Sequence, residues 1–481
     1  MPERRSSAGR PTVLLAALLA ACALFAAPLS AATVITTPTM HLGFGPSGAL
    51  ESAVACYPAC QAQGARIGQF GDEAVVDIAA QGRDPTRGRW RLSRSESATH
   101  LELSFDDGQG SSVRWRIPRS GYRLEVELEG LGGLRVSSGL SFRPRDAAGF
   151  GDWLETTRYV TNVAGGPEQI GLEEPVERVF RAVSWTGYRN RFWTLLVQPP
   201  GVTDAELLTG EGQRDARIDF QLAQPGPWSI YLGPVEPRAL ADADPALSGL
   251  LYASLWFWLR WICFSLFYLL GAIHTLLPSW GLSIMALSVV VGVLMLPLSR
   301  IADRLQQQVN ETEARLAPEL QRIKKNCRGE EQAAKILALY KTERVHPLYS
   351  LKSMAGVAVV IPVFIGAFDM LAENIQLLNV GFLWIADLSR TDALFQLPFR
   401  LPFFGDEFNL LPVLMTALSF LASVLHKPPA LDAASRHRQV RNMLLLAMVF
   451  FVLFYTFPAG MVLYWTTNNL ISVIKGLWAR R

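Results

Sequence analysis

The sequence predicts a mixed fold, in which an exported antiparallel β-sandwich is followed by an α-helical membrane domain. A basic flank and an apolar run open the chain, residues 33–245 are polar with scattered Gly and Pro, and residues 251–479 contain several long uncharged runs. Runs of roughly 20 apolar residues are long enough to cross a bilayer. We therefore expect one exported domain joined to a membrane domain, in a chain of 481 residues that is 50% hydrophobic.

Residues 1–32 are expected to direct the chain to the membrane. "MPERRSSAGR" supplies a basic flank and "PTVLLAALLAACALFAAPLSAA" an apolar core, which is the pattern of export or insertion. Three fates of this segment fit the sequence. Pro28 followed by Ser30-Ala31-Ala32 resembles the end of a cleaved signal peptide, "LAAC" at 19–22 resembles a lipoprotein box, and the length also suits a retained spanning helix.

Alternating apolar and polar residues predict half-buried strands in the exported domain, residues 33–245. "THLELSF" at 99–105 and "YRLEVELEG" at 122–130 place every second side chain on the same face of a strand. "RFWTLLVQP", "ARIDFQLAQ" and "WSIYLGP" repeat the pattern between Gly and Pro turns, so an antiparallel sandwich is expected. The domain does not group a nucleophile with a base and an orienting residue, and we expect no catalytic residues.

Cys56 and Cys60 are the two cysteines, among five, that lie close together in the sequence. Their spacing fits no zinc pattern, so no metal site is expected. An exported domain meets an oxidising compartment, where this pair can form a disulfide. The alternative is two unlinked cysteines in a Pro-containing turn.

The distribution of Lys and Arg orients the membrane domain. Residues 300–345 are rich in both, so the positive-inside rule places them in the cytoplasm. That placement requires residues 246–280 to lie along the outer interface as an amphipathic segment, because two crossings before residue 300 would put the basic loop outside. The membrane domain proper, 281–481, then has predicted spans at 281–299, 353–371, 409–425, 442–457 and 461–477.

The cytoplasmic loop at 303–345 shows helical periodicity that is broken at "KKNCRGEE", which predicts two helices joined by a turn. We expect this hairpin to contact a partner through its exposed basic side chains. A solvated connector is the alternative, since charge runs are usually solvated. The candidate contact residues are Arg315, Lys324, Lys325, Lys341 and Arg344.

Several polar side chains lie within the predicted spans, where hydrocarbon penalises a polar group that lacks a partner or water. Thr416, Ser419 and Ser423 recur at i, i+3 and i+7, which places them on one helix face. Such residues either line a water-containing cavity or hydrogen-bond neighbouring helices. The other candidates for a cavity are Ser288, Asp369, Thr467 and Asn468.

Six motifs resemble the YidC/Oxa/Alb membrane protein insertases, in the Gram-negative YidC form with a large periplasmic domain. They are "YLGPVEP", "LWFW", "WGLSIMALSVVVGVLMLPLS", "ALYKTERVHPL", "GFLWIADLS" and "FPAGMVLYWTTNNL". The resemblance implies a periplasmic β-supersandwich and five core spans that enclose a hydrophilic groove, open to the cytoplasm and to lipid. It also implies a multi-pass protein of the bacterial inner membrane.

The same resemblance implies a function and a set of partners. The function is the insertion and folding of inner-membrane proteins, without enzymatic chemistry, cofactor or nucleotide. The implied partners are newly made membrane proteins, the lipid bilayer, the Sec translocon and the ribosome, with no nucleic acid apart from ribosome contact.

Gly292 departs from the family pattern. Family members carry an arginine at this place, five positions before the Pro that matches the one in "LPLS", and Asp369 stands where members have an aromatic residue. A groove without this arginine fits an insertase with different clients, or a scaffold that assists assembly without inserting. A membrane-anchored periplasmic binding module is a third alternative, which the intramembrane Asn residues disfavour.

Overall fold

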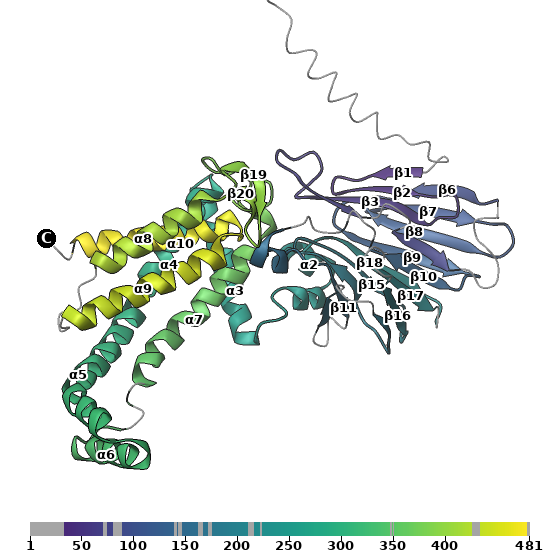
Figure 1. Ribbon diagram of the computed structural model, residues 1–481. Helices are drawn as coiled ribbons and strands as arrows, with labels where there is room; N and C mark the ends of the chain where they lie inside the picture. The colour runs from purple at the N-terminus through teal and green to yellow at the C-terminus, as the bar shows by residue number, and fades with distance from the viewer. Residues whose placement is uncertain are drawn as a thin grey trace, which may run out of the picture.

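The computed structural model describes residues 33–70, 75–79, 89–138, 142, 147–161, 167–171, 176–209, 216–221, 224–346, 349, 351–425 and 433–478. The expectations for residues 1–32 therefore lie outside the described residues. A sheet domain and a helical bundle lie side by side, and a helical hairpin projects from the bundle (Figure 1). The predicted fold class, an antiparallel sheet domain followed by a helical region, is confirmed.

Two sheets, each of nine described strands, form the sheet domain, and all their pairings are antiparallel. The first sheet runs in spatial order through β1 (Thr33–Thr36), β2 (Met40–Phe44), β3 (Leu50–Tyr57), β5 (Val76–Ala79), β10 (Gly133–Ser137), β17 (Ala216–Gln221), β16 (Ala205–Thr209) and β13 (Glu177–Phe180), with β4 (Arg66–Phe70) beside β3. The second runs through β12 (Glu168–Gly171), β11 (Arg158–Thr161), β14 (Thr186–Arg189), β15 (Trp193–Gln198), β18 (Pro227–Pro234), β9 (Arg123–Glu129), β8 (Ser112–Pro118), β7 (His100–Asp106) and β6 (Arg91–Glu96).

Strand β9 illustrates why the sheets pack face to face. Leu124 and Val126 are completely buried, whereas Glu125 between them faces outward. Glu125 pairs with Arg116, which lies directly opposite on β8, at 3.1 Å. The alternation thus gives each sheet an apolar inner face and an outer face with cross-strand ion pairs.

The chain passes from the sheets to the bundle through two short helices, α2 (Pro237–Ala243) and η3 (Pro245–Leu250). A third short helix, η2 (Gly149–Leu154), lies between β10 and β11. The bundle comprises α3 (Phe257–Leu276), α4 (Trp280–Leu294), α5 (Leu296–Asn326), α6 (Gly329–Thr342), α7 (Leu351–Ala372), η4 (Ile375–Leu377), the hairpin β19 (Phe395–Leu401) and β20 (Gly405–Phe408), α8 (Leu410–Leu425), α9 (Ala433–Phe454) and α10 (Ala459–Trp478). Helix α10 packs against α8 and α4, and α7 packs against α3 and α5.

A bend divides the segment predicted as the first span, 281–299. Helix α4 ends at Leu294, α5 begins at Leu296, and their axes differ by 53°. Pro297 explains the position of the break, because a proline has no N–H to donate and its ring clashes with the preceding turn. Helix α5 then continues to Asn326, so the projecting hairpin, α5 and α6, begins before residue 303, where the sequence had predicted its start.

Length and composition single out α3 among the described helices as able to cross a bilayer, with the bent α4–α5 pair as a second if it acts as one span. Apolar helical segments at Ile361–Ala372, Leu410–Leu425 and Leu444–Phe454 are shorter. The sequence had instead predicted an interfacial position for 246–280 and five spans after it. By length and composition, the described helices thus include at most two that could span a bilayer, fewer than the five predicted.

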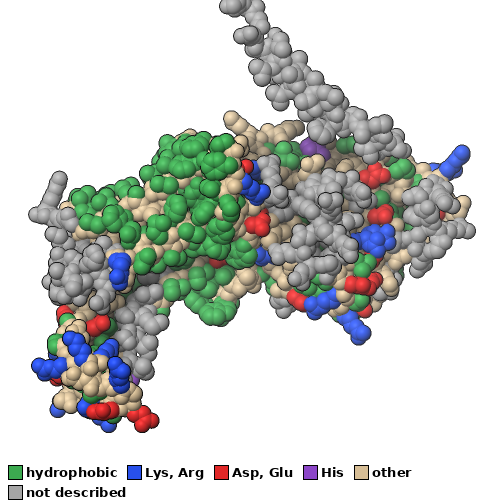
Figure 2. Space-filling model, viewed as in Figure 1, with side chains coloured by type: hydrophobic (Ala, Val, Ile, Leu, Met, Phe, Trp, Pro, Cys, Tyr) green, Lys and Arg blue, Asp and Glu red, His purple; other side chains and the backbone are tan. Residues whose placement is uncertain are grey.

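The surface nevertheless separates apolar from charged regions. Apolar side chains cover the visible face of the bundle, whereas charged side chains gather on the hairpin and on the sheet domain (Figure 2). An exposed apolar surface of this extent marks a region that contacts lipid or protein. The bundle therefore has an apolar surface suited to contact with lipid or protein, with polar regions at both ends.

Candidate functional site

A hydrogen-bonded pair of helices forms the polar centre of the bundle. Asn469 of α10 donates from Nδ2 to Ser419 Oγ at 2.6 Å and to the Met415 carbonyl at 3.1 Å, and both acceptors belong to α8. A carboxamide in an apolar bundle is stable only when its donors are satisfied. Asn469 therefore fixes α8 against α10, a role that periodicity within either helix could not reveal.

Thr416 and Thr467 each donate a hydrogen bond to a backbone carbonyl of their own helix. Thr416 donates to the Pro412 carbonyl at 2.8 Å, and Thr467 donates to the Leu463 carbonyl at 2.8 Å. Bonds to the carbonyl four residues earlier let Ser and Thr lie in hydrocarbon without water. These hydroxyls add polarity to the bundle but do not by themselves require a water-filled cavity.

Ser423 and Asn468 complete the predicted set on α8 and α10. Both are partly exposed, and the backbone carbonyl of Asn468 accepts a hydrogen bond from Ser472 at 3.0 Å. The predicted residues of α8 thus lie on the helix that Asn469 contacts. Asn468 is the neighbour of Asn469 on α10.

Ser288 lies on the buried face of α4. It is 1% exposed and shares that face with the buried apolar residues Ile284, Leu287 and Val291. Its hydroxyl has no hydrogen-bond partner among the described residues. A buried hydroxyl without a partner lowers the stability of the fold, so Ser288 is the position on α4 where a hydrogen-bonding ligand or water would be favoured.

Gly292 follows Ser288 by one helical turn, and it is partly exposed. A Cβ atom added at this position would meet no heavy atom within 4 Å. The site where the family pattern has an arginine therefore has open space beside it. The first atom of a side chain at position 292 would therefore meet no neighbour.

Asp369 lies apart from the α8–α10 residues, near the end of α7. Among the described residues, no hydrogen bond or ion pair joins its carboxylate to that set. One turn later, Glu373 pairs with Arg189 of β14 at 3.2 Å, where the arginine side chain is 5% exposed. Asp369 thus lies beside a contact between the bundle and the sheet domain.

The hairpin presents its predicted basic residues to the surroundings. Lys324, Lys325, Lys341 and Arg344 are exposed. Arg315 of α5 lies 3.6 Å from Glu343, just after α6, and this pair connects the two arms of the hairpin. The turn between the helices falls at Cys327 and Arg328, inside the predicted "KKNCRGEE" segment.

Sequence reasoning missed the contact between the sheet domain and the end of the bundle, in which Arg191 is central. Its Nε donates to the Ala372 carbonyl at the end of α7 at 2.6 Å, and its Nη1 donates to the Ser389 carbonyl at 2.8 Å. Nη1 also pairs with Glu155 at 2.6 Å. We call Arg189, Arg191, Glu155 and Glu373 the domain joint.

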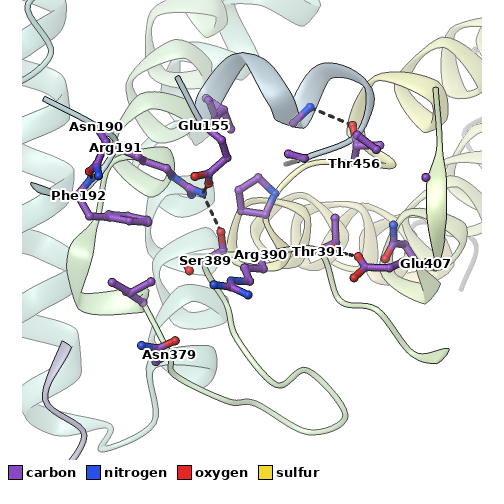
Figure 3. A pocket seen from close by; sticks show the side chains of 18 of the residues that line it. Glu155, Asn190, Arg191, Phe192, Asn379, Ser389, Arg390, Thr391, Glu407 and Thr456 are labelled. Carbon is purple, nitrogen blue, oxygen red and sulfur yellow. Dashed lines mark hydrogen bonds and ion pairs between the residues drawn. The ribbon is translucent and has the colours of Figure 1, made fainter. Parts of the chain in front are cut away.

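A cavity of about 570 Å³ lies beside the domain joint (Figure 3). Its lining includes Arg191 and Glu155 from the sheet domain, Arg390 from a loop of the helical region and Glu407 from β20. Charges of both signs thus face a space between the two domains. No sequence pattern indicated it, because its walls are far apart in the chain.

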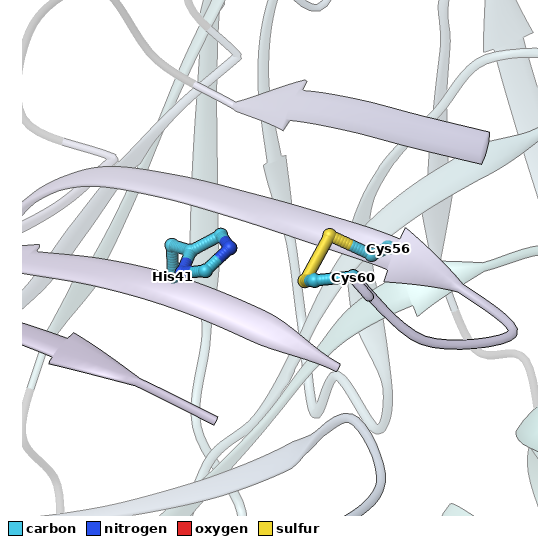
Figure 4. Close-up of side chains that lie close together, drawn as sticks. All are labelled: His41, Cys56 and Cys60. Atoms are coloured by element: carbon cyan, nitrogen blue, oxygen red, sulfur yellow. A yellow bond between two sulfur atoms is a disulfide. The ribbon is translucent and has the colours of Figure 1, made fainter. Parts of the chain in front are cut away.

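Cys56 and Cys60 are joined by a disulfide, and His41 lies beside them (Figure 4). The His ring nitrogen and the two sulfurs are within 4.8 Å of one another, which is close enough to resemble a metal site. Sulfurs bonded to each other offer no thiolate, and the thiolate is the metal ligand. His41 instead shares a hydrogen bond of 3.2 Å with Thr36.

Comparison with known proteins finds similarity in the helical region. Residues 272–481 match the family described as 60Kd inner membrane protein. A protein named membrane protein insertase YidC from Laribacter hongkongensis is 32% identical over 255 residues, which are 52% of this chain and 41% of that protein. A protein of the same name from Neisseria gonorrhoeae is 31% identical over 251 residues, which are 51% of this chain and 41% of that protein.

The chain thus spans less than half the length of the relatives that it matches. A crystal structure described as active YidC insertase, with its first transmembrane domain resolved, covers 97% of this chain and 98% of its own at 16% identity. Its TM-score of 0.35 is too low to support any argument. By sequence, residues 272–481 are therefore similar to the 60Kd inner membrane protein family and to proteins named membrane protein insertase YidC.

Proposed function

We propose that this protein helps to insert and fold proteins of the bacterial inner membrane. The observation that carries the proposal is the match of residues 272–481 to the inner-membrane family, together with relatives that are named membrane protein insertases. The apolar surface of the bundle and the polar link between α8 and α10 are consistent with it. No cofactor or covalent step is part of the proposed activity.

The proposed arrangement has five core spans, formed by α4, α7, α8, α9 and α10, with α3 along the outer interface. The hairpin then lies in the cytoplasm and the sheet domain in the periplasm, in agreement with the positive-inside rule. The basic hairpin residues contact the newly made client, and the Sec translocon and ribosome are proposed further partners. Local thinning of the bilayer and snorkelling of flanking side chains can accommodate helices shorter than the average hydrocarbon thickness.

The proposed chemistry is the lowering of a transfer cost. When a polar client segment crosses hydrocarbon without hydrogen-bond partners, each unsatisfied group raises the transfer free energy by roughly 2–7 kcal/mol. We propose that Ser288, Thr416, Ser419, Thr467 and Asn468 line a groove, open to the cytoplasm and to lipid, that offers such a segment hydrogen-bonding groups partway. The client backbone is then never fully desolvated.

Gly292 supports a second candidate, a scaffold that assists membrane assembly without inserting. The open space beside this position holds no basic side chain, so the groove lacks the charge that the family pattern places there. An anchored periplasmic binding module is a weaker candidate, because an anchor gains nothing from the Asn469 contact between α8 and α10.

Complementation tests the proposal. A host is depleted of its own insertase while the full chain is expressed, and the insertion of an inner-membrane client is scored by protease protection. We expect restored growth and client insertion. A chain that accumulates in the membrane at the level of the host protein and restores neither outcome would refute the insertase proposal in favour of the scaffold.

A further inference from the structure

The short helix η2 connects the sheet domain to the membrane-facing surface of the bundle. It belongs to the sheet domain by sequence, since it lies between β10 and β11. Gly151 donates its backbone N–H to Thr456 Oγ1, in the turn between α9 and α10, at 3.1 Å. A Cβ atom on Gly151 would collide with the Thr456 carbonyl oxygen, so the close approach requires a glycine.

Two aromatic side chains of η2 roof a small cavity at the end of α7 and α9. The cavity has a volume of about 210 Å³. Every lining residue is apolar, and five of the seven are phenylalanine: Phe150, Trp153, Phe364, Phe368, Leu453, Phe454 and Phe457. A space with no polar group along its walls favours an apolar occupant over water, which needs several polar partners.

The roof is open to the surroundings. Phe150 and Trp153 remain 43% and 58% exposed, although Phe150 packs edge-on against Phe403 of the β19–β20 hairpin, with ring centroids 5.0 Å apart. Further exposed aromatic residues occur at the start of α3, where Trp256 and Trp261 are each 72% exposed. Tryptophan side chains concentrate at the boundary between lipid headgroups and hydrocarbon.

We infer that the cavity binds an acyl chain of an outer-leaflet phospholipid and that η2 seats the sheet domain on the lipid surface. The inference rests on the proposed membrane placement of α7 and α9, because the cavity walls continue the apolar surfaces of these helices. A helix with its side chains is about 10–12 Å wide, so a client helix is too wide for this space. A single acyl chain has the slender and wholly apolar form that the lining requires.

A photoactivatable phospholipid, with a diazirine on its acyl chain, provides the test. The full chain is reconstituted into vesicles of phosphatidylethanolamine and phosphatidylglycerol that contain this lipid, and the cross-linked peptides are identified by mass spectrometry. We expect an adduct on the peptide that contains Phe150 and Trp153, besides those on α7 and α9. Leu453→Phe, which fills the cavity, should reduce the η2 adduct at least fivefold.

Val449→Phe is the matched control, because Val449 lies one turn earlier on α9, is 62% exposed and does not line the cavity. It should leave the η2 adduct unchanged. Equal η2 adducts in the two variants, or none on η2 while α7 and α9 are cross-linked, would overturn the acyl-chain site. Absence of adducts from α7 and α9 as well would overturn the proposed membrane placement itself, so the two failures are distinguishable.

A label on η2 gives a second, independent measurement. Trp153→Cys, carrying a nitroxide in a chain whose other unpaired cysteines are replaced by serine, should be accessible to oxygen and protected from a water-soluble nickel chelate. Val179→Cys on β13 is the control, since Val179 is 57% exposed, nearly as much as Trp153. Equal nickel access at both positions would refute the contact of η2 with lipid.

Discussion

Gly292 offers a direct test of whether charge governs client choice. We predict that Gly292→Arg raises insertion of a client with an acidic translocated segment severalfold, because a cation there attracts the segment and the added side chain meets no heavy atom near its Cβ. Asp369→Asn should have a smaller effect in the same direction, because Asp369 lies apart from the polar residues of α8 and α10. The measurement is insertion of paired acidic and neutral versions of one client.

The unmodified chain should insert the neutral client better than the acidic one. Gly292→Gln provides the matched control, since it adds a long polar side chain without a charge. If both clients were inserted equally, before and after Gly292→Arg, charge would have no part in client choice and the scaffold function would be favoured.

Glu236 makes the stability of the sheet domain depend on pH. The side chain is 3% exposed and accepts a hydrogen bond from the Ala239 N–H at 2.8 Å, and burial raises the pKa of its carboxyl group above the usual range. A raised folded-state pKa means that the folded protein takes up the proton more readily than the unfolded protein. The free energy of unfolding therefore rises as pH falls through the raised value toward the ordinary one.

We predict that Glu236→Gln removes this rise while it keeps an acceptor for the Ala239 N–H. The size is about 1.4 kcal/mol for each unit by which the pKa is raised. The measurement is the free energy of unfolding of the full chain in detergent, at pH values from neutral to about the ordinary carboxyl pKa. Unfolding is followed by the sheet signal in circular dichroism. Glu177→Gln, at an exposed position on β13, is the control and should retain the pH dependence.

At the scale of elements, the outer arm of the hairpin, α6, has few ties to the bundle. Helix α6 has no buried residue, and its charges face the surroundings. We predict that deletion of residues 306–341 leaves the protein accumulating in the membrane but weakens binding of ribosomes or clients at least fivefold. Binding is measured by co-sedimentation with ribosome–nascent chain complexes, and accumulation by immunoblot of the membrane fraction.

The double substitution Lys324→Glu and Lys325→Glu separates charge from length in that experiment. It keeps the helix and should reproduce most of the binding loss, because both side chains are exposed. Loss of the protein from the membrane on deletion would instead assign the hairpin a structural role and support the solvated-connector alternative.

The elements that could be predicted from the sequence are those whose signals are local. The alternation over 122–130 is visible in one strand, and the turn at Cys327 and Arg328 follows from a break in periodicity. Asn469 bonds to Ser419, 50 residues away, and Arg191 reaches the Ser389 carbonyl 198 residues away. Such contacts depend on how finished elements pack, so neither propensity nor spacing indicates them. The bend before Pro297 could be predicted only in part. The proline is visible in the sequence, but the residues on both sides of it favour a helix, so the sequence does not show whether the helix continues.

At the scale of the whole molecule, the position of the hairpin determines the orientation of every helix. Cys327 is a poor target for a thiol reagent because it is 6% exposed, so we choose the exposed neighbour Glu330. With Cys327 replaced by serine, Glu330→Cys should react with a membrane-impermeant maleimide only after lysis of spheroplasts, whereas Val34→Cys, at a position 67% exposed, should react in intact ones. Reaction of Glu330→Cys in intact spheroplasts would place the hairpin outside and make α3 a span.

The domain joint predicts that the sheet domain and the bundle unfold together. Arg191 is 6% exposed and is shared by Glu155, the Ala372 carbonyl and the Ser389 carbonyl. Arg191→Leu leaves the two carbonyls and the partly exposed Glu155 carboxylate without their partner, and an unsatisfied buried acceptor costs about 1–3 kcal/mol. We expect the single thermal transition of the native chain to separate into two, one in the sheet signal and one in the helix signal of circular dichroism.

Arg178→Leu is the control for the loss of an arginine from the same domain. Its ion pair with Glu168 spans 3.1 Å, but both side chains are about half exposed, at 53% and 45%. Exposed pairs of this kind contribute about 0–1 kcal/mol, so the single transition should persist in this variant. If Arg191→Leu also kept one transition, with a midpoint like that of Arg178→Leu, the two domains would be coupled through other contacts. The Gly151–Thr456 hydrogen bond of η2 would then be the next contact to test, because it joins the same two domains without using a charge.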